Sequence, residues 1–113
     1  MPLTNEKTKN RAFLQDMYND GYFPKHLVDK GKQILVRLCE RIENEKPVDE
    51  SALYQLTHAA TDEFNALAEE FSDEGSELET AARESIGEEF WFIATAYGYP
   101  NADSEELIAT RDW

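Results

Sequence analysis

The chain has 113 residues, of which 41% are hydrophobic and 31% are charged, and its formal net charge is -13. A chain of this length is expected to form one domain, residues 1–113, whose core needs no metal ion or disulfide. The negative charge repels nucleic acid and anionic lipid, so we expect neither nucleic acid nor a membrane as a partner.

The first predicted element is a helix over residues 5–18. Thr4 precedes it as the N-cap, because its hydroxyl can accept a hydrogen bond from a free N–H of the first turn. Its apolar positions recur at i, i+1, i+4 and i+5 and are Phe13, Leu14, Met17 and Tyr18. The Asn19-Asp20-Gly21 sequence that follows is typical of a turn and should end the helix.

A second helix is predicted from Pro24, which suits a first helical position, to Lys46. Spacings of three and four give it one apolar face, formed by Val28, Gly31, Ile34, Leu35, Leu38, Cys39 and Ile42. Gly31 lies in the middle of this face, where glycine costs about 1 kcal/mol relative to alanine. We expect another helix to cross closely at Gly31, with simple tolerance of the glycine as the alternative.

The third predicted helix begins after Asp49, whose carboxylate can act as its N-cap. Val48 and Leu53 have the spacing of a hydrophobic staple across that cap. The apolar positions follow at spacings of 3, 4, 4, 3 and 4 and are Leu53, Leu56, Ala60, Phe64, Leu67 and Phe71. This narrow arc is typical of an amphipathic helix, which should end in the turn sequence of residues 72–75.

The fourth predicted helix begins at Ser76, which can form a capping box with Glu79, and ends at Gly98. Its main apolar face comprises Leu78, Ala82, Ile86, Phe90, Ile93 and Tyr97. Trp91 and Phe92 project elsewhere, so apolar side chains surround the second half of the helix. We expect that half to be the most buried segment, with a dimer covering Trp91 if the monomer does not.

A short fifth helix over residues 104–110 is predicted from Asp103 and Glu106, which have the spacing of a capping box. No strand-like alternation occurs in the sequence. We therefore predict an all-α fold, an irregular four-helix bundle plus a short C-terminal helix. The second, third and fourth helices should form its core, with the first packed across them.

Cysteine content and apolar runs bear on the compartment. Cys39 is the only cysteine, so no intramolecular disulfide can form, and its place on an apolar face predicts a core residue. The start of the chain, residues 1–6, has no apolar region of a secretion signal. The longest apolar run, residues 90–94, is far shorter than the roughly 20 residues that a membrane helix needs. We therefore expect a cytoplasmic protein.

The charges are unevenly distributed along the sequence. Residues 1–46 contain nine Lys or Arg and seven Asp or Glu, whereas residues 47–113 contain two and seventeen. Between Pro47 and Ala82 there are ten carboxylates and no Lys or Arg. Such a field would steer a basic partner towards this half of the chain, although acidity that only maintains solubility is the alternative.

Motifs for cofactors and metals are absent from the sequence. The Gly31-Lys32 pair lacks the upstream glycine and the following Ser or Thr of a phosphate-binding loop. Neither His26 nor His58 has the glutamate spacing of a helical di-iron or zinc site, and residues 73–75 lack the ligand pattern of a calcium loop. We assign no cofactor, no metal and no catalytic residue, and an enzymatic activity is less expected than binding.

Two polar positions on the predicted helices have alternative interpretations. His58 and Asp62 are i, i+4 neighbours that could serve acid–base chemistry, but an exposed pair on the polar face is the favoured interpretation. Glu89 falls near the apolar face of the fourth helix. A carboxylate there lies at a rim or pairs with a base, and we expect a structural ion pair with Arg37 or Arg83.

Several short stretches of the chain resemble a small bacterial all-helical family of unknown function. They are Asp16-Met17-Tyr18 through Gly21-Tyr22-Phe23-Pro24, Leu27-Val28-Asp29-Lys30, Glu79-Thr80-Ala81-Ala82-Arg83 and Ala109-Thr110-Arg111-Asp112-Trp113. The resemblance implies a small helical bacterial protein. It implies no activity, cofactor or catalytic residue.

For function, the sequence favours a non-catalytic acidic module that binds a basic protein, as a monomer or homodimer. The candidate partner-binding residues are Asp62, Glu63, Glu69, Glu70, Asp73 and Glu74. The alternative is a small-molecule-binding or enzymatic domain that uses the aromatic end of the fourth helix. The aromatic candidates for such a pocket are Tyr18, Tyr22, Phe23, Phe90, Trp91, Phe92, Tyr97, Tyr99 and Trp113.

Overall fold

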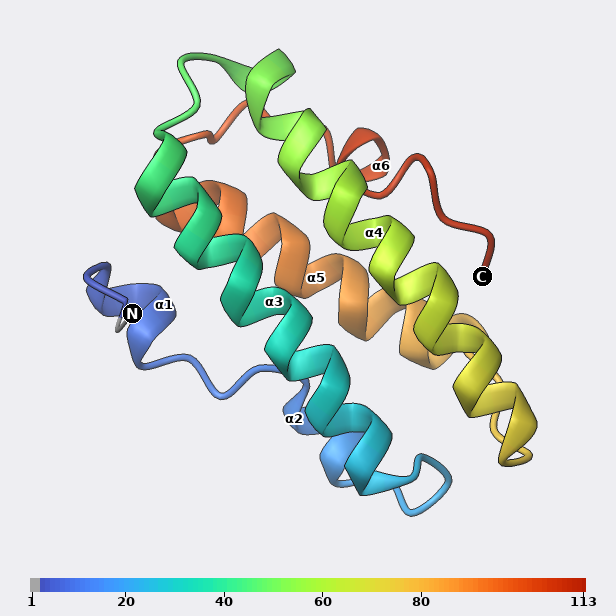
Figure 1. The fold of residues 1–113 in the computed structure, drawn as a ribbon. Helices are drawn as coiled ribbons and strands as arrows, with labels where there is room; N and C mark the ends of the chain where they lie inside the picture. Colours follow the sequence, from blue (N-terminus) through green and yellow to red (C-terminus); the bar gives the residue numbers. More distant parts are fainter. Residues whose placement is uncertain (1–2) are drawn as a thin grey trace.

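Three long helices form the framework of this computed structural model, which describes residues 3–113 (Figure 1). The six helices of the described residues are α1 (Glu6–Lys9), α2 (Gln15–Tyr18), α3 (Lys25–Glu45), α4 (Glu50–Asp73), α5 (Thr80–Ala96) and α6 (Ser104–Leu107). They confirm the all-α fold. Met1 and Pro2, which begin the stretch considered for a targeting signal, lie outside the described residues. Within residues 3–113, no helix is long and apolar enough to cross a membrane.

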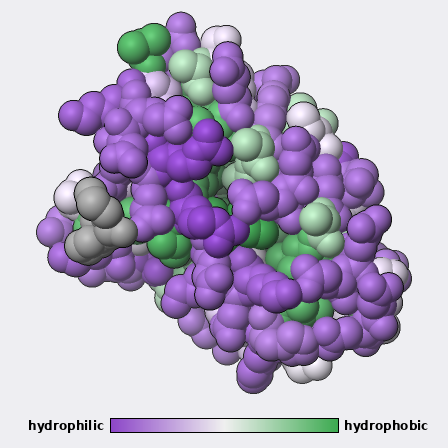
Figure 2. All heavy atoms as spheres, viewed as in Figure 1, coloured by the Kyte–Doolittle hydropathy of each residue, from purple (hydrophilic) through white to green (hydrophobic). Residues whose placement is uncertain are grey.

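The helices α3 and α4 run antiparallel side by side, and α5 packs behind them (Figure 1). Their apolar faces meet in one core, in which the Phe64 ring lies edge-on to Phe90 with centroids 5.9 Å apart. Cys39 is fully buried there, as predicted. The α3–α4 face seen in Figure 2 is mostly hydrophilic, with smaller hydrophobic areas between the polar side chains. The three long helices thus leave polar outer faces on which a site can be built.

The chain before α3 is broken into two single helical turns, so the continuous helix predicted over residues 5–18 is wrong. Asn5, and not Thr4, is the N-cap of α1, because its side chain accepts hydrogen bonds from the backbone N–H groups of Lys7 and Thr8. Leu14 adopts the left-handed region at φ 60° immediately before α2. A β-carbon makes that conformation costly, and it interrupts the helix.

Gly31 lies at a close approach, as its position on the apolar face predicts. A β-carbon at Gly31 would be 3.0 Å from Leu14 Cδ1 and 3.2 Å from Phe64 Cε1. The neighbours are thus side chains of α4 and of the chain before α3, residues 3–24, which we call the N-terminal segment. The glycine gives Leu14 the room to reach the core, where it is fully buried.

The helix α4 begins as predicted, with the Asp49 carboxylate accepting a hydrogen bond from Ala52 N at 2.9 Å. The predicted hydrophobic staple is wrong, because Val48 is 91% exposed while Leu53 is fully buried. The cap alone therefore defines this helix start.

The helix α5 begins at Thr80, four residues later than predicted. Ser76 does not cap it, because its hydroxyl is buried without a hydrogen-bond partner, and Glu79 is the N-cap residue without a side-chain bond. The predicted end is confirmed, since Gly98 follows the helix with φ +89°. Trp91 is 48% exposed, so the prediction that the second half of α5 is buried on all sides is wrong.

The last helix, α6, is a single turn and shorter than the predicted residues 104–110. Asp103 is its N-cap, as predicted, and its carboxylate accepts hydrogen bonds from the N–H groups of Glu105 and Glu106. The turn contacts both α4 and α5 (Figure 1). It therefore forms a wall next to α5.

Candidate functional site

Half of the carboxylates proposed on α4 are paired with basic side chains of α3. The pairs are Arg37–Glu63 and Lys30–Glu70, each with 2.6 Å between nitrogen and oxygen, and His26–Glu74 with 2.8 Å. The other half are Asp62, Glu69 and Asp73, which are exposed and have no ion pair within residues 3–113. The structure therefore places five of the six residues on α4 and Glu74 at its C-cap, and basic side chains of α3 neutralise part of their charge.

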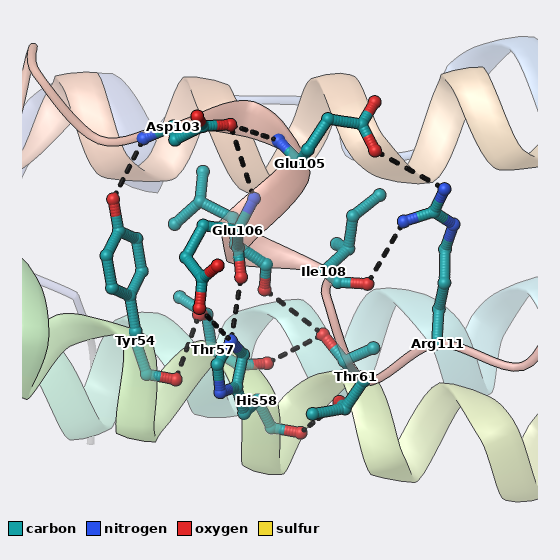
Figure 3. A network of polar contacts seen from close by, with 11 residues as sticks. Tyr54, Thr57, His58, Thr61, Asp103, Glu105, Glu106, Ile108 and Arg111 are labelled. Carbon is teal, nitrogen blue, oxygen red and sulfur yellow. Dashed lines mark hydrogen bonds and ion pairs between the residues drawn. The ribbon is translucent and has the colours of Figure 1, made fainter.

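His58 does not pair with Asp62, so that prediction is wrong. Its Nε2 lies 2.7 Å from the Glu106 carbonyl oxygen and 3.6 Å from the Glu106 carboxylate (Figure 3). Its ring also stacks on Tyr54, with centroids 6.2 Å apart. The imidazole thus fastens α6 to α4 and is not a free surface group.

A network of polar contacts holds residues 103–113, the C-terminal segment, on α4 (Figure 3). The Tyr54 hydroxyl accepts a hydrogen bond from Asp103 N at 2.9 Å, and the buried Thr61 hydroxyl contacts the Leu107 carbonyl at 3.3 Å. Side chains at three successive turns of α4 therefore hold this segment in place.

A groove of about 570 Å³ separates α5 from this fixed segment. It is lined by Thr80, Arg83, Glu84, Gly87, Glu88, Trp91, Ser104, Glu105, Ile108 and Arg111. Arg83 and Arg111 are the only two Lys or Arg residues of residues 47–113. Arg83 donates to the Trp113 carbonyl at 3.0 Å, whereas Arg111 pairs with Glu105 at 3.4 Å and donates to the Ile108 carbonyl at 3.3 Å. Both arginines therefore hold the C-terminal segment.

The α5 wall of the groove presents two free carboxylates beside a half-exposed indole. Glu84, Glu88 and Trp91 follow one another at i, i+4 and i+7, which places them on one face of the helix. Within residues 3–113, no hydrogen bond or ion pair joins the side chain of Glu84 or Glu88 to another residue. This wall can therefore offer negative charge and an aromatic surface to a ligand.

A second, smaller hollow lies on the other side of the same two glutamates. Its volume is about 320 Å³, and its lining residues are Asp16, Met17, Asp20, Phe23, Ala81, Glu84, Ser85 and Glu88. Four of them are carboxylates and none is basic. Glu84 and Glu88 line both hollows, so these two carboxylates lie between the groove and the more acidic second hollow.

On the inner side of α5, Glu89 is 3% exposed and forms the predicted structural ion pair with an unexpected partner. Its Oε1 lies 3.0 Å from Nη2 of Arg11, and its Oε2 accepts a hydrogen bond from Leu14 N at 2.6 Å. Neither Arg37 nor Arg83 takes part, because Arg37 faces α4 and Arg83 binds the C-terminal segment. The contact with Leu14 N stabilises the left-handed turn.

The polar groups at the aromatic end of α5 are engaged in hydrogen bonds. The hydroxyls of Tyr97 and Tyr99 donate to the Glu43 carboxylate and to the Pro47 carbonyl. Burial alone would raise the pKa of Glu43, but hydrogen bonds from Tyr97, Thr4 and Asn5 lower it to about 2. These hydrogen bonds join residues 4–5 and Tyr97, the residue after α5, to Glu43 of α3.

Two further observations concern chemistry. Burial raises the pKa of the Cys39 thiol to about 12, so the chain has no thiolate nucleophile near neutral pH. Within residues 3–113, no group of three His, Cys, Asp or Glu side chains could hold a metal ion.

The carboxylates of the α5 surface were missed by sequence reasoning. Glu84 and Glu88 lie outside the run between Pro47 and Ala82, where the charge is densest. A signal for them exists, since Glu88 and Trp91 are i, i+3 neighbours on the polar side of a helix whose apolar face is already assigned. The contribution of Asp16 and Asp20 depends on how the N-terminal segment folds back.

A model of the family described as a family of unknown function, DUF5713, matches residues 7–113. No curated protein and no solved structure matches the chain.

Proposed function

The chain belongs to this family of unknown function (DUF5713), and we propose that it is a non-catalytic acidic module that binds a basic protein partner. One observation carries the proposal: exposed carboxylates without ion-pair partners lie on both helices, α4 and α5, that contact the fixed C-terminal segment. Those on α4 are Asp62, Glu69 and Asp73, and those on α5 are Glu84 and Glu88. Unpaired like charges destabilise a fold by repulsion, so a surface that retains them favours an electrostatic role.

The two helices that carry these carboxylates both contact the C-terminal segment. Asn65 of α4 donates to the Thr110 carbonyl at 3.1 Å and accepts from Asp112 N at 2.9 Å. Ile108 and Arg111 of the same segment line the groove beside α5. A basic partner that crosses the segment would therefore meet negative charge on both sides.

The alternative, a small-molecule-binding or enzymatic site at the aromatic end of α5, has less support. The hollow there is lined by Thr4, Asn5, Ile42, Glu43, Lys46, Pro47, Tyr97 and Tyr99. Its tyrosine hydroxyls and its carboxylate are bonded to one another or to the backbone. Few polar groups are left to orient a ligand or to transfer a proton.

The test is affinity capture from the native cytosol, with mass spectrometric identification of the captured proteins. We expect basic proteins to bind at about 0.1 M salt and to be lost at about 1 M, because the Debye length falls from about 10 Å to about 3 Å. Lysine substitution at Asp62, Glu69 and Asp73 should weaken capture without breaking the α3–α4 ion pairs.

The matched control places lysine at Glu63, Glu70 and Glu74, which already have basic neighbours. That variant changes the net charge equally. Capture of no basic protein by the wild type at low salt would contradict the proposal. Co-purification of an enzyme substrate or a small metabolite with the protein would favour the alternative, a small-molecule-binding or enzymatic site.

A further inference from the structure

The inner side of α5 already binds an arginine through an aromatic ring and a carboxylate. The guanidinium carbon of Arg11 lies 4.4 Å from the centroid of the Phe92 ring. Its Nε and Nη2 both lie 3.0 Å from Glu89 Oε1. Glu89 and Phe92 are i, i+3 neighbours, so a single helical turn supplies both contacts.

The same residue types recur at the same spacing one position earlier. Glu88 and Trp91 are also i, i+3 neighbours, turned by about 100° around the axis of α5. Trp91 is 48% exposed, and Glu88 has no partner within residues 3–113. No cation of the described residues stacks on the indole. The outer pair therefore repeats the inner arrangement without its arginine.

From this repetition we infer that Trp91 and Glu88 form the seat for an arginine side chain of the basic protein partner. The inference rests on the proposed function and specifies the chemistry of its surface. The guanidinium plane lies on the indole, which is the best aromatic surface for a cation, and its edge pairs with Glu88. Glu84, one turn earlier on the same face, offers a second carboxylate.

The charges around the seat favour a basic segment over a single cation. Arg83 and Arg111 line the groove, but their guanidinium groups are engaged with the Trp113 carbonyl and with Glu105. Beyond Glu88, the second hollow adds Asp16 and Asp20 with no basic residue. The partner chain can thus place one arginine on Trp91 and further basic residues along the acidic hollow.

The experiment titrates the full chain with a tetra-arginine peptide amide at low salt. Tetra-lysine and the neutral tetra-citrulline serve as comparison peptides. We expect the indole N–H signal of Trp91 to shift saturably in nitrogen-15 spectra, with that of Trp113 unchanged. Because an arginine stacks better than a lysine, tetra-arginine should bind more tightly than tetra-lysine, and tetra-citrulline should not bind.

Two variants test the seat by calorimetric titration with the same peptide. Trp91→Ala and Glu88→Gln should each weaken binding by about three- to tenfold. Glu45→Gln is the control, because Glu45 is an exposed carboxylate of α3 that lies outside the proposed binding surface. It should change the affinity less than about twofold, as expected for a remote surface charge. Nitrogen-15 spectra of each variant verify that the fold is intact.

The outcomes separate the seat from the proposed function. Equal losses in Glu88→Gln and Glu45→Gln, or equal binding of the arginine and lysine peptides, would overturn the seat and leave a diffuse acidic binder. A captured basic partner whose binding is undiminished by Trp91→Ala would do the same. Absence of any captured basic protein, with the peptide still bound at Trp91, would instead contradict the proposed function.

Discussion

The inner and outer sides of α5 carry the same residue types and differ in what covers them. On the inner side, Arg11 and Leu14 of the N-terminal segment contact Glu89. On the outer side, Glu88 and Trp91 face a groove. The helix sequence alone is nearly symmetrical at these positions. The fold of a segment about 75 residues earlier therefore decides which glutamate is structural and which is free to bind.

The largest difference between the two sides should appear in stability. Glu89→Ala should lower the free energy of unfolding by about 2–4 kcal/mol, because it leaves Leu14 N–H buried without an acceptor. The half-exposed Arg11 can hydrate, which limits the loss. Glu88→Ala should change stability by less than about 0.5 kcal/mol. Denaturant melts of both variants measure the contrast, and equal losses would break it.

Gly31 tests the packing that Glu89 holds in place. Gly31→Ala should destabilise the fold by about 1–2 kcal/mol, because the new methyl group would crowd Leu14 and Phe64. Leu14 has little freedom to move while its N–H is bound to Glu89. Urea melts check this effect. A variant as stable as the wild type would show that Leu14 and Phe64 move aside without cost.

Gly87 is the matched position on the outer side. A β-carbon there would meet Ile108 Cδ1 at 3.5 Å, which is an ordinary van der Waals contact. Gly87→Ala should therefore stabilise the fold by up to about 1 kcal/mol, since alanine is the better helix former. Thermal melts of the two alanine variants should shift in opposite directions. A fall in both midpoints would contradict the difference between the two sides.

The smallest expected effect is the response of the N-terminal segment to acid. The pKa of Glu43 is about 2 in the folded chain against an ordinary value of 4.5, so its contribution is complete above pH 4.5. Stability from this group should fall as the pH decreases from about 4.5 to about 2. The protection factors of the Thr4 and Asn5 amides, which correct for the intrinsic slowing of exchange in acid, should decrease over that window. The response should be absent in Glu43→Gln, and a wild type whose protection factors stay constant throughout would contradict it.

The long helices could be predicted because their cause is local. The spacing of Leu53, Phe64 and their neighbours defines α4, and Asp49 defines its start. The predictions for Ser76 and Val48 were wrong because a capping box and a hydrophobic staple also need the flanking chain to lie against the first turn of the helix. Tertiary packing does not bring these two residues to that position. The sequence pattern thus predicted the three long helices better than the contacts of the residues that precede α4 and α5, Val48 and Ser76.

The contacts of the N-terminal segment could not be predicted in the same way. The apolar spacing of Phe13 to Tyr18 fits a helix, but the break at Leu14 is stabilised by Glu89 from another element. The carboxylate was expected to pair, yet its partner depends on that break. Charge density pointed to α4, although α3 neutralises Glu63 and Glu70 there. Which carboxylates remain without ion pairs depends on which helices become neighbours, and the sequence pattern does not specify that.

Because Cys39 is buried, the reactivity of the only thiol of this chain reports how often the core opens. Its raised pKa of about 12 and its lack of exposure keep it protonated and out of reach of alkylating reagents in the folded state. Alkylation should then proceed only through transiently opened molecules. A maleimide reaction followed by mass spectrometry would record how often the core opens, without any engineered label and in the presence of a bound partner.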